Sequence, residues 1–143
     1  MDSINTNVGD QLYAIKMVLD RNIKIEVGRL GECDFQKGSY IYIGSAKRNI
    51  GSRINRHVTI EKVKRWHLDY FRPFVTIQHV ITFPVHGGEC QLKEFLQNEL
   101  LGEVVVPRFG SSDCKCDSHL IKVKREGSEN IYHLREMWLT NRH

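Results

Sequence analysis

Residues 38–57, with the sequence GSYIYIGSAKRNIGSRINRH, contain a change in hydrophobic period that constrains the fold more than any other segment. The first part alternates, so a strand here would turn its two tyrosines to one face and its two isoleucines to the other. These residues are Tyr40, Tyr42, Ile41 and Ile43. After a Gly-Ser turn, the apolar residues Ile50, Ile54 and Val58 recur every four positions, as on one stripe of a helix. The segment therefore predicts a strand that leads directly into a helix.

The remaining segments predict an α+β domain, with a small, mostly antiparallel β-sheet flanked by helices. Strand patterns occupy residues 11–19, 22–28, 75–84 and 120–124, and a very short strand is predicted at 104–106. A helix is predicted over 89–102, with Gly102 in the C-cap position, and 63–74 is a short amphipathic piece that ends at Pro73. The segment 130–139 fits either a strand or a helix.

The length of 143 residues suits one domain with one ordinary hydrophobic core. We expect a flexible N-terminus at 1–10, the domain itself at 11–124, and a C-terminal extension of undetermined structure at 125–143. No apolar run approaches the ~18–20 residues of a membrane span, and the first residues lack the basic start and apolar stretch of a secretory signal. These features predict a cytoplasmic protein without a membrane partner, and cysteines in the thiol state. The oligomeric state is left open.

Positive charge is concentrated between residues 47 and 72. This segment has eight basic and two acidic residues, an excess of six, whereas the whole chain has a net charge of +4. Such an excess attracts phosphate through Coulomb forces and counterion release, although a solvated helix face can have the same composition. The side chains predicted to contact nucleic acid are Lys47, Arg48, Arg56, Lys62, Lys64 and Arg65.

Three side chains on the predicted strand and helix have the chemistry of a phosphate site. On a helical wheel, Arg53 and His57 lie along one edge of the apolar stripe, whereas Arg56 lies further round and is expected to point to solvent. With Tyr42 they could supply a cation for the phosphate and a group that positions or deprotonates water. The structural alternative makes Tyr42 a core aromatic residue and lets the Arg53 stem cover apolar surface.

The segment YIYIGSAKRNIGSRINRH resembles the GIY-YIG nuclease family. Tyr42, Ile43 and Gly44 match its second triplet, Arg53 and His57 match its helix positions, and Gln11-Leu12-Tyr13 keeps only the tyrosine of its first triplet. The closer resemblance is to a small-domain branch of that superfamily, which occurs alone or fused to DNA glycosylases of the endonuclease III type. The resemblance covers roughly residues 11–124, and its signatures include VGRLGECDFQKGSYIYIGSA, RINRH, KRWHLDY, EC and FGSSDCKCDSHL.

The resemblance implies a role for each matched residue. Tyr13 and Tyr42 would line the site, with one of them orienting or deprotonating water. Arg53 would bind the scissile phosphate, and His57 would assist by hydrogen bonding or proton transfer. The long spacing between the two tyrosines implies an inserted β-hairpin built from residues 22–37.

The resemblance also implies a metal ligand. Glu89, at the start of the later helix, would hold Mg²⁺ or Mn²⁺ through oxygen atoms. From the sequence, a glutamate in a first helical turn is also favoured by the helix dipole, and Glu94 or Glu99 could take the metal instead.

The sequence WHLDY at 66–70 is a second cluster. Trp66 and Tyr70 would form a packing pair on a helix, with His67 and Asp69 as a hydrogen-bonded structural pair. Alternatively, His67 or Asp69 reaches the cleft as an extra metal or phosphate contact.

The loop GSSDCKCDSH at 110–119 is a third cluster. Cys114, Cys116 and His119 could bind Zn²⁺, with a fourth ligand from Cys90, Asp113 or Cys33. Otherwise it is a tight loop held by side-chain hydrogen bonds to backbone, or Ser111, Ser112 and Asp113 line the cleft beside a reduced Cys114.

These patterns support three hypotheses. The first is a metal-dependent endonuclease-like domain that hydrolyses phosphodiester bonds in DNA or structured nucleic acid by in-line attack of water. The second is a non-catalytic nucleic-acid-binding module of the same fold. The third is a structural domain stabilised by zinc.

Overall fold

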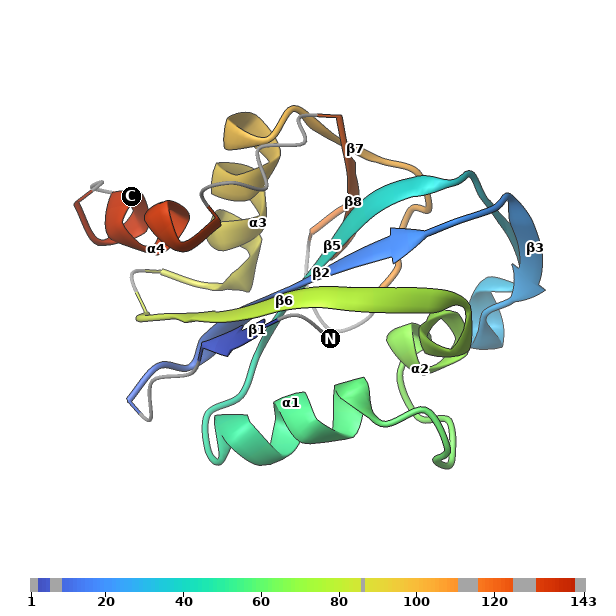
Figure 1. Ribbon diagram of the computed structural model, residues 1–143, viewed down its shortest axis with the longest axis horizontal. Helices are drawn as coiled ribbons and strands as arrows, with labels where there is room; N and C mark the ends of the chain where they lie inside the picture. Colours follow the sequence, from blue (N-terminus) through green and yellow to red (C-terminus); the bar gives the residue numbers. More distant parts are fainter. Residues whose placement is uncertain (1–2, 6–8, 86, 111–115, 125–130, 141–143) are drawn as a thin grey trace.

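A six-stranded sheet with the strand order β1-β6-β2-β5-β8-β7 forms the centre of the molecule (Figure 1). The computed structural model describes residues 3–5, 9–85, 87–110, 116–124 and 131–140. The strands are β1 (Ser3–Asn5), β2 (Leu12–Leu19), β5 (Gly38–Ser45), β6 (Val75–Phe83), β7 (Gly102–Val104) and β8 (Leu120–Val123). Neighbouring strands are antiparallel except β1 and β6, which are parallel. The predicted α+β class with a mostly antiparallel sheet is confirmed.

Helices cover both faces of this sheet (Figure 1). One face carries α1 (Ile50–Val58), α2 (His67–Phe71) and the 3₁₀ turn η2 (Arg72–Phe74), and the other carries α3 (Glu89–Glu99) and α4 (Ile131–Thr140). The core accordingly consists of two apolar clusters, one on each side of the sheet. The predicted alternation of β5 is confirmed, because its tyrosines belong to the first cluster and its isoleucines to the second.

A separate two-stranded sheet extends the α1 and α2 layer. It consists of β3 (Ile23–Glu26) and β4 (Glu32–Phe35), joined by the 3₁₀ turn η1 (Gly28–Leu30). The Phe35 ring packs 4.4 Å, centroid to centroid, from Phe71 of α2. The predicted hairpin within residues 22–37 is therefore present.

Described residues at both ends of the chain contribute elements to the fold. Residues 3–5 form β1, and the buried Asp10 accepts hydrogen bonds from the Arg135 guanidinium of α4 at 3.1–3.3 Å. Trp138 of α4 is fully buried and donates through Nε1 to the Pro84 carbonyl at 2.7 Å. Helix α4 is thus part of the domain core.

Two smaller corrections concern the connection after α3. The helix ends at Glu99 instead of 102, and β7 lies at Gly102–Val104 instead of 104–106. The reason is Leu101, whose φ of 52° places it in the left-handed region and reverses the chain at once into the strand.

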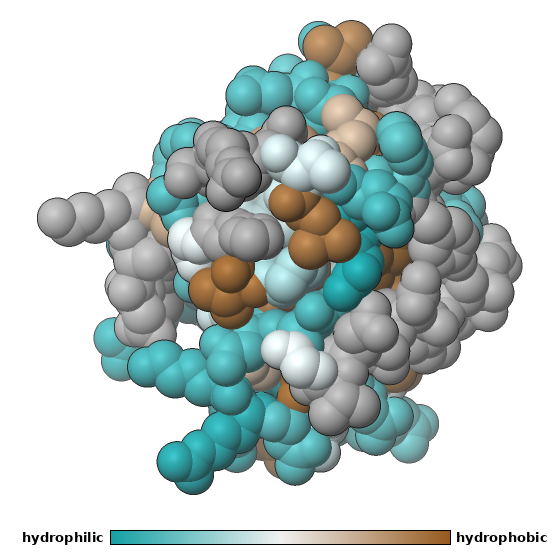
Figure 2. All heavy atoms as spheres, turned by 90° about the vertical axis from the view of Figure 1, so that its left-hand side faces the viewer, coloured by the Kyte–Doolittle hydropathy of each residue, from teal (hydrophilic) through white to brown (hydrophobic). Residues whose placement is uncertain are grey.

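The exposed apolar side chains are scattered over the described part of the surface. Large ones at least 39% exposed are Ile60, Val63, Val85, Leu101 and Leu139. Figure 2 shows one side of the molecule, where hydrophobic residues form small separate patches among hydrophilic ones. Scattered apolar residues are usual on protein surfaces. Within the described residues, no helix combines the length and apolarity needed to cross a bilayer.

Candidate active site

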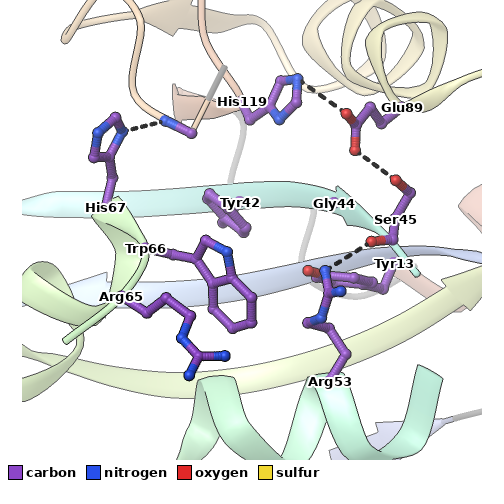
Figure 3. A pocket seen from close by; sticks show the side chains of 11 residues that line it. Tyr13, Tyr42, Gly44, Ser45, Arg53, Arg65, Trp66, His67, Glu89 and His119 are labelled. Atoms are coloured by element: carbon purple, nitrogen blue, oxygen red, sulfur yellow. Dashed lines mark hydrogen bonds and ion pairs between the residues drawn. The ribbon is translucent and has the colours of Figure 1, made fainter. Parts of the chain in front are cut away.

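A pocket of about 250 Å³ lies where β2 begins and β5 ends (Figure 3). Side chains from both helical layers and from the loop before β8 line it. They are Tyr13, Tyr42, Ser45, Arg53, Arg65, Trp66, His67, Glu89 and His119, together with Gly44 and Gly110. The pocket therefore brings together Tyr13, Tyr42, Arg53 and Glu89, four of the five side chains predicted for hydrolysis and metal binding. The fifth, His57, lies behind Tyr13.

His57 fixes the hydroxyl group of Tyr13. The Tyr13 Oη and His57 Nε2 atoms are 2.7 Å apart, and the imidazole is only 1% exposed. Three aromatic rings, those of Tyr13, Tyr42 and Trp66, lie within 5.6 Å of it, centroid to centroid. Its other nitrogen, Nδ1, is buried without a hydrogen-bond partner. The geometry makes His57 a positioning residue for the tyrosine.

Burial keeps the side chains of His57, Tyr13 and Tyr42 uncharged at neutral pH. It lowers the pKa of His57 to about 3, an effect that the nearby Lys62 charge reinforces. It also raises the pKa of Tyr13 and of Tyr42 well above the ordinary value of 10.0, against the opposing effect of the Arg53 charge. At neutral pH both phenols are therefore protonated, so they can orient a ligand or water by hydrogen bonding.

Arg53 supplies a positive charge on the α1 side of the pocket. Its Nη1 donates to the Ser45 carbonyl at 3.1 Å, and its guanidinium carbon lies 4.7 Å from the centroid of the Trp66 ring. The ring and the carbonyl orient the guanidinium, which Figure 3 shows beside the Tyr13 hydroxyl.

Glu89 supplies a negative charge from the opposite layer. It is the first residue of α3, and its Oε2 accepts a hydrogen bond from Ser45 Oγ at 2.8 Å. The alternatives Glu94 and Glu99 lie further along α3 and do not line the pocket. Ser45 thus contacts both charged groups, with its carbonyl at Arg53 and its hydroxyl at Glu89. Sequence reasoning missed this role, and the only signal was the position of Ser45 in the turn after the strand.

The fold and this pocket can be compared with known proteins. A family model described as a domain of unknown function, DUF123, matches residues 12–138. The chain belongs to the DUF123 family. No curated protein matches it, and no solved structure does. The DUF123 match extends from β2 to Trp138, so the family domain includes α4 and reaches past the predicted boundary at residue 124.

Trp66 adds a third aromatic side chain to the pocket, beside Tyr13 and Tyr42, whereas the sequence analysis predicted only a packing role for it. Trp66 is half-buried and lines the pocket. Three guanidinium carbons lie within 6.0 Å of its ring centroid, those of Arg53, Arg56 and Arg65. Arg65, predicted to bind nucleic acid, is exposed and contributes a second positive charge to the pocket lining.

The two polar residues of WHLDY have separate places. His67 reaches the pocket, where its Nδ1 accepts a hydrogen bond from the Gly110 backbone N–H at 2.7 Å. Asp69 has a side chain with no exposed surface and does not line the pocket. The predicted His67–Asp69 pair is therefore wrong, because each residue bonds to a different segment.

Asp69 instead anchors the start of α2. Its carboxylate accepts hydrogen bonds from the backbone N–H groups of Arg65 and Trp66, and it forms ion pairs with Arg56 at 2.9 Å and Lys62 at 3.1 Å. These contacts, opposed by burial, hold the pKa of Asp69 at about 2. The expectation that Arg56 points to solvent is wrong, since the buried carboxylate draws it inward.

The predicted nucleic-acid-binding cations thus fall into two groups. Lys47, Arg48, Lys64 and Arg65 are exposed. Arg56 and Lys62 are engaged with Asp69, and only 7% of the Lys62 side chain is exposed. The positive charge available to an external partner comes from the first group.

The cysteine loop contributes the last wall of the pocket. Cys90 and Cys116 form a disulfide, so the thiol state predicted from the sequence is wrong for this pair, whereas Cys33 is a buried free cysteine. Donor atoms of Cys90, Cys116 and His119 all lie within 4.8 Å of one another, a group that could hold a metal ion. The predicted contributors Ser111, Ser112, Asp113 and Cys114 lie outside the described residues.

Proposed function

We propose that this DUF123 domain hydrolyses phosphodiester bonds in nucleic acid, with DNA as the first substrate to test, and uses a divalent metal ion. The observation that carries the proposal is the convergence of Arg53 and Glu89, from helices on opposite faces of the sheet, on one pocket lined by two tyrosines. A cation for phosphate next to a carboxylate for metal is the minimum that hydrolysis of a phosphodiester requires. The resemblance of this segment to the GIY-YIG nucleases supports the same activity.

The residues of the pocket fit Mg²⁺ or Mn²⁺. Mg²⁺ is usually held by one or two carboxylates and substrate phosphate while it keeps several water ligands. Glu89 supplies one carboxylate, and its hydrogen bond to Ser45 Oγ orients it. When bound, the ion would polarise a phosphoryl oxygen and lower the pKa of a bound water.

The remaining pocket residues would bind the phosphate and orient the attacking water. Arg53 would pair with a non-bridging phosphate oxygen and offset the charge that develops there. The Tyr13 hydroxyl, fixed by His57, and the Tyr42 hydroxyl would donate to or accept from the attacking water or the phosphate. Because both phenols stay protonated, they position the water and leave its proton to solvent or to Glu89.

The exposed cations fit a nucleic acid partner. Lys47, Arg48, Lys64 and Arg65 can each neutralise a backbone phosphate without reading a base, so we expect little sequence specificity. A cytoplasmic location agrees with a nucleic acid substrate and remains part of the proposal.

A non-catalytic binding module is the second candidate. It is favoured by the single carboxylate, Glu89, among the described residues that line the pocket. The same basic side chains would then bind nucleic acid without cutting it.

The two candidates are separated by cleavage assays on labelled duplex and branched DNA, with Mg²⁺, with Mn²⁺ and with chelator. We expect metal-dependent cleavage that falls at least about 100-fold in Arg53→Ala and in Glu89→Gln. Glu94→Gln, which changes an exposed carboxylate on the same helix, is the matched control and should keep full activity. Wild-type protein that binds DNA but cuts it with none of the ions would leave only the binding module.

A further inference from the structure

We propose that Cys90, Cys116 and His119 bind one zinc ion when the Cys90–Cys116 pair is reduced. This site is distinct from the Glu89 carboxylate proposed for Mg²⁺, and it does not depend on phosphodiester hydrolysis. It also differs from the ligand set predicted from the sequence, because Cys90, predicted there only as one option for a fourth ligand, is one of the three donors that lie together.

The donor atoms are already near the positions that zinc requires. With Zn–S bonds of about 2.3 Å and Zn–N bonds of about 2.0 Å, tetrahedral angles separate sulfur from nitrogen by about 3.5 Å and the two sulfurs by about 3.8 Å. Cys90 Sγ lies 3.9 Å from His119 Nε2, and all three donors lie within 4.8 Å. Once the disulfide is opened, the two sulfur atoms have to move apart to reach this spacing.

The chemistry of the donors selects zinc over the hard cations. Thiolate is a soft ligand that binds Zn²⁺ well and Mg²⁺ poorly, and imidazole suits zinc too. Two cysteines and one histidine with a fourth position open form a known type of zinc coordination. Here that position would be taken by water, since His119 faces the pocket (Figure 3).

The reaction that opens the site balances with a dithiol reductant. The reductant gives two electrons and two protons to the Cys90–Cys116 bond and becomes a disulfide itself. Zinc then displaces the two thiol protons, so that two thiolates and one Zn²⁺ leave the centre without net charge. A neutral centre would not compete with Arg53 for phosphate.

The backbone around the ligands is held independently of the sulfur atoms. Buried Lys93 of α3 forms an ion pair with Asp117 at 2.5 Å, and the Asp117 carbonyl accepts from the Arg108 N–H at 2.6 Å. The His119 N–H donates to the Phe109 carbonyl at 2.8 Å. The loop and the helix therefore stay together when the disulfide is reduced, and the ligands remain close.

Zinc at this site would position the residue next to it. Cys90 directly follows Glu89, so a metal bridge from Cys90 to the start of β8 would fix the first turn of α3. The Glu89 carboxylate, 3.8 Å from His119 Nε2, would then be fixed relative to the pocket.

Zinc content tests the proposal without any activity assay. Full-length protein is prepared with and without a dithiol reductant, equilibrated with Zn²⁺, desalted and analysed for metal. The reduced wild type should retain about one zinc per chain and the oxidised wild type almost none. Replacement of zinc by Co²⁺ should give a thiolate-to-metal charge-transfer band and the strong visible bands of tetrahedral cobalt.

The variants identify the ligands. Cys90→Ser and Cys116→Ser should each weaken zinc binding at least about tenfold, and His119→Asn should do the same. Cys33→Ser, in the hairpin, and Glu89→Gln should both keep full zinc content. Retention of full zinc content by Cys90→Ser would overturn the proposal. Failure of the reduced wild type to retain zinc would overturn it as well, and this measurement does not depend on the stability of any variant. Because Glu89→Gln is expected to lose cleavage but keep zinc, the two proposals fail separately.

Discussion

Gly44 of β5 lies directly opposite Tyr13 of β2 in the sheet, and the tyrosine ring covers the space that a side chain at Gly44 would occupy. A methyl group built on Gly44 would lie 2.4 Å from the Tyr13 oxygen and 2.5 Å from the carbon that bears it. Gly44→Ala should therefore displace the Tyr13 ring from His57 and lower the free energy of unfolding by about 1–3 kcal/mol. Chemical denaturation measures the loss.

Gly51→Ala is the matched control. Gly51 is exposed on α1 and has open space around its Cα, so alanine there should stabilise the helix by about 0.5–1 kcal/mol. If Gly44→Ala unfolds like the wild type, the close contact with Tyr13 does not constrain that position.

Ser45→Ala removes the hydroxyl group that orients Glu89 but leaves the carbonyl that Arg53 uses. We expect Mn²⁺ affinity, or metal-dependent cleavage, to fall by roughly 10–100-fold, as for other groups that orient a metal ligand. Titration of Mn²⁺ followed by water proton relaxation gives the affinity directly. Ser52→Ala, an exposed serine on α1, should change nothing, and equal losses in both variants would argue against the Ser45 contact.

Asp69→Ala should lower the free energy of unfolding by about 3–5 kcal/mol, because it leaves Lys62 buried without its carboxylate and removes the acceptor for two N–H groups at the start of α2. Asp34→Ala breaks a solvent-exposed pair with Lys24 and should cost about 1 kcal/mol or less. Equilibrium urea denaturation compares the two. Similar small losses would show that the buried ion pairs add little beyond an exposed one.

The shifted pKa of His57 predicts a specific dependence of stability on pH. The unfolded histidine gains a proton below about 6.5, whereas the folded one does so only near 3. The contribution of neutral His57 to the free energy of unfolding is therefore complete above pH 6.5. It is lost as the pH falls, by at most about 1.4 kcal/mol per pH unit. The slope between pH 4 and 6.5 should be shallower in His57→Gln.

The comparison with this variant is needed because burial also lowers the pKa values of His67 and His119. Asp69, whose pKa is shifted from 3.8 to about 2, also loses its contribution to the free energy of unfolding from about pH 5 downward, but this loss is common to the wild type and His57→Gln. Parallel pH curves for His57→Gln and the wild type would contradict a neutral buried His57.

Trp138→Ala tests whether α4 belongs to the domain. The side chain is fully buried against Phe95 and the Pro84 carbonyl, so its removal should lower the free energy of unfolding by about 3–5 kcal/mol. Leu139→Ala, at the adjacent and 39% exposed position, should lower it by less than about 1 kcal/mol. Thermal unfolding of both variants and of a chain that ends at residue 124 would show whether residues 11–124 fold alone.

Local sequence patterns correctly predicted strand β5 and helix α1. The alternation of β5 and the four-residue spacing on α1 depend only on neighbouring residues, and both are confirmed. The same spacing correctly placed Arg53 and His57 on the side of α1 that faces the sheet. The resemblance to a family supplied the prediction of the hairpin and of two further pocket residues, Tyr13 and Glu89.

Contacts between distant segments could not be predicted in this way. A helical wheel places Arg56 toward solvent because it cannot show that Asp69, thirteen residues later, is buried beside it. In the same way, nothing local indicates that Cys90 meets Cys116 or that Arg135 meets Asp10. Each of these pairs depends on which helix the sheet brings to which edge.

Ser45 has a consequence for how the pocket is filled. Arg53 and Glu89 contact different atoms of this one residue, and among the described ion pairs none joins them to each other. The positive charge of Arg53 and the negative charge of Glu89 therefore do not neutralise each other, and each can pair with an ion of opposite charge from solution. Under the proposed function, a phosphate would pair with the guanidinium and a metal ion with the carboxylate, so the phosphate and the metal ion should bind with positive cooperativity.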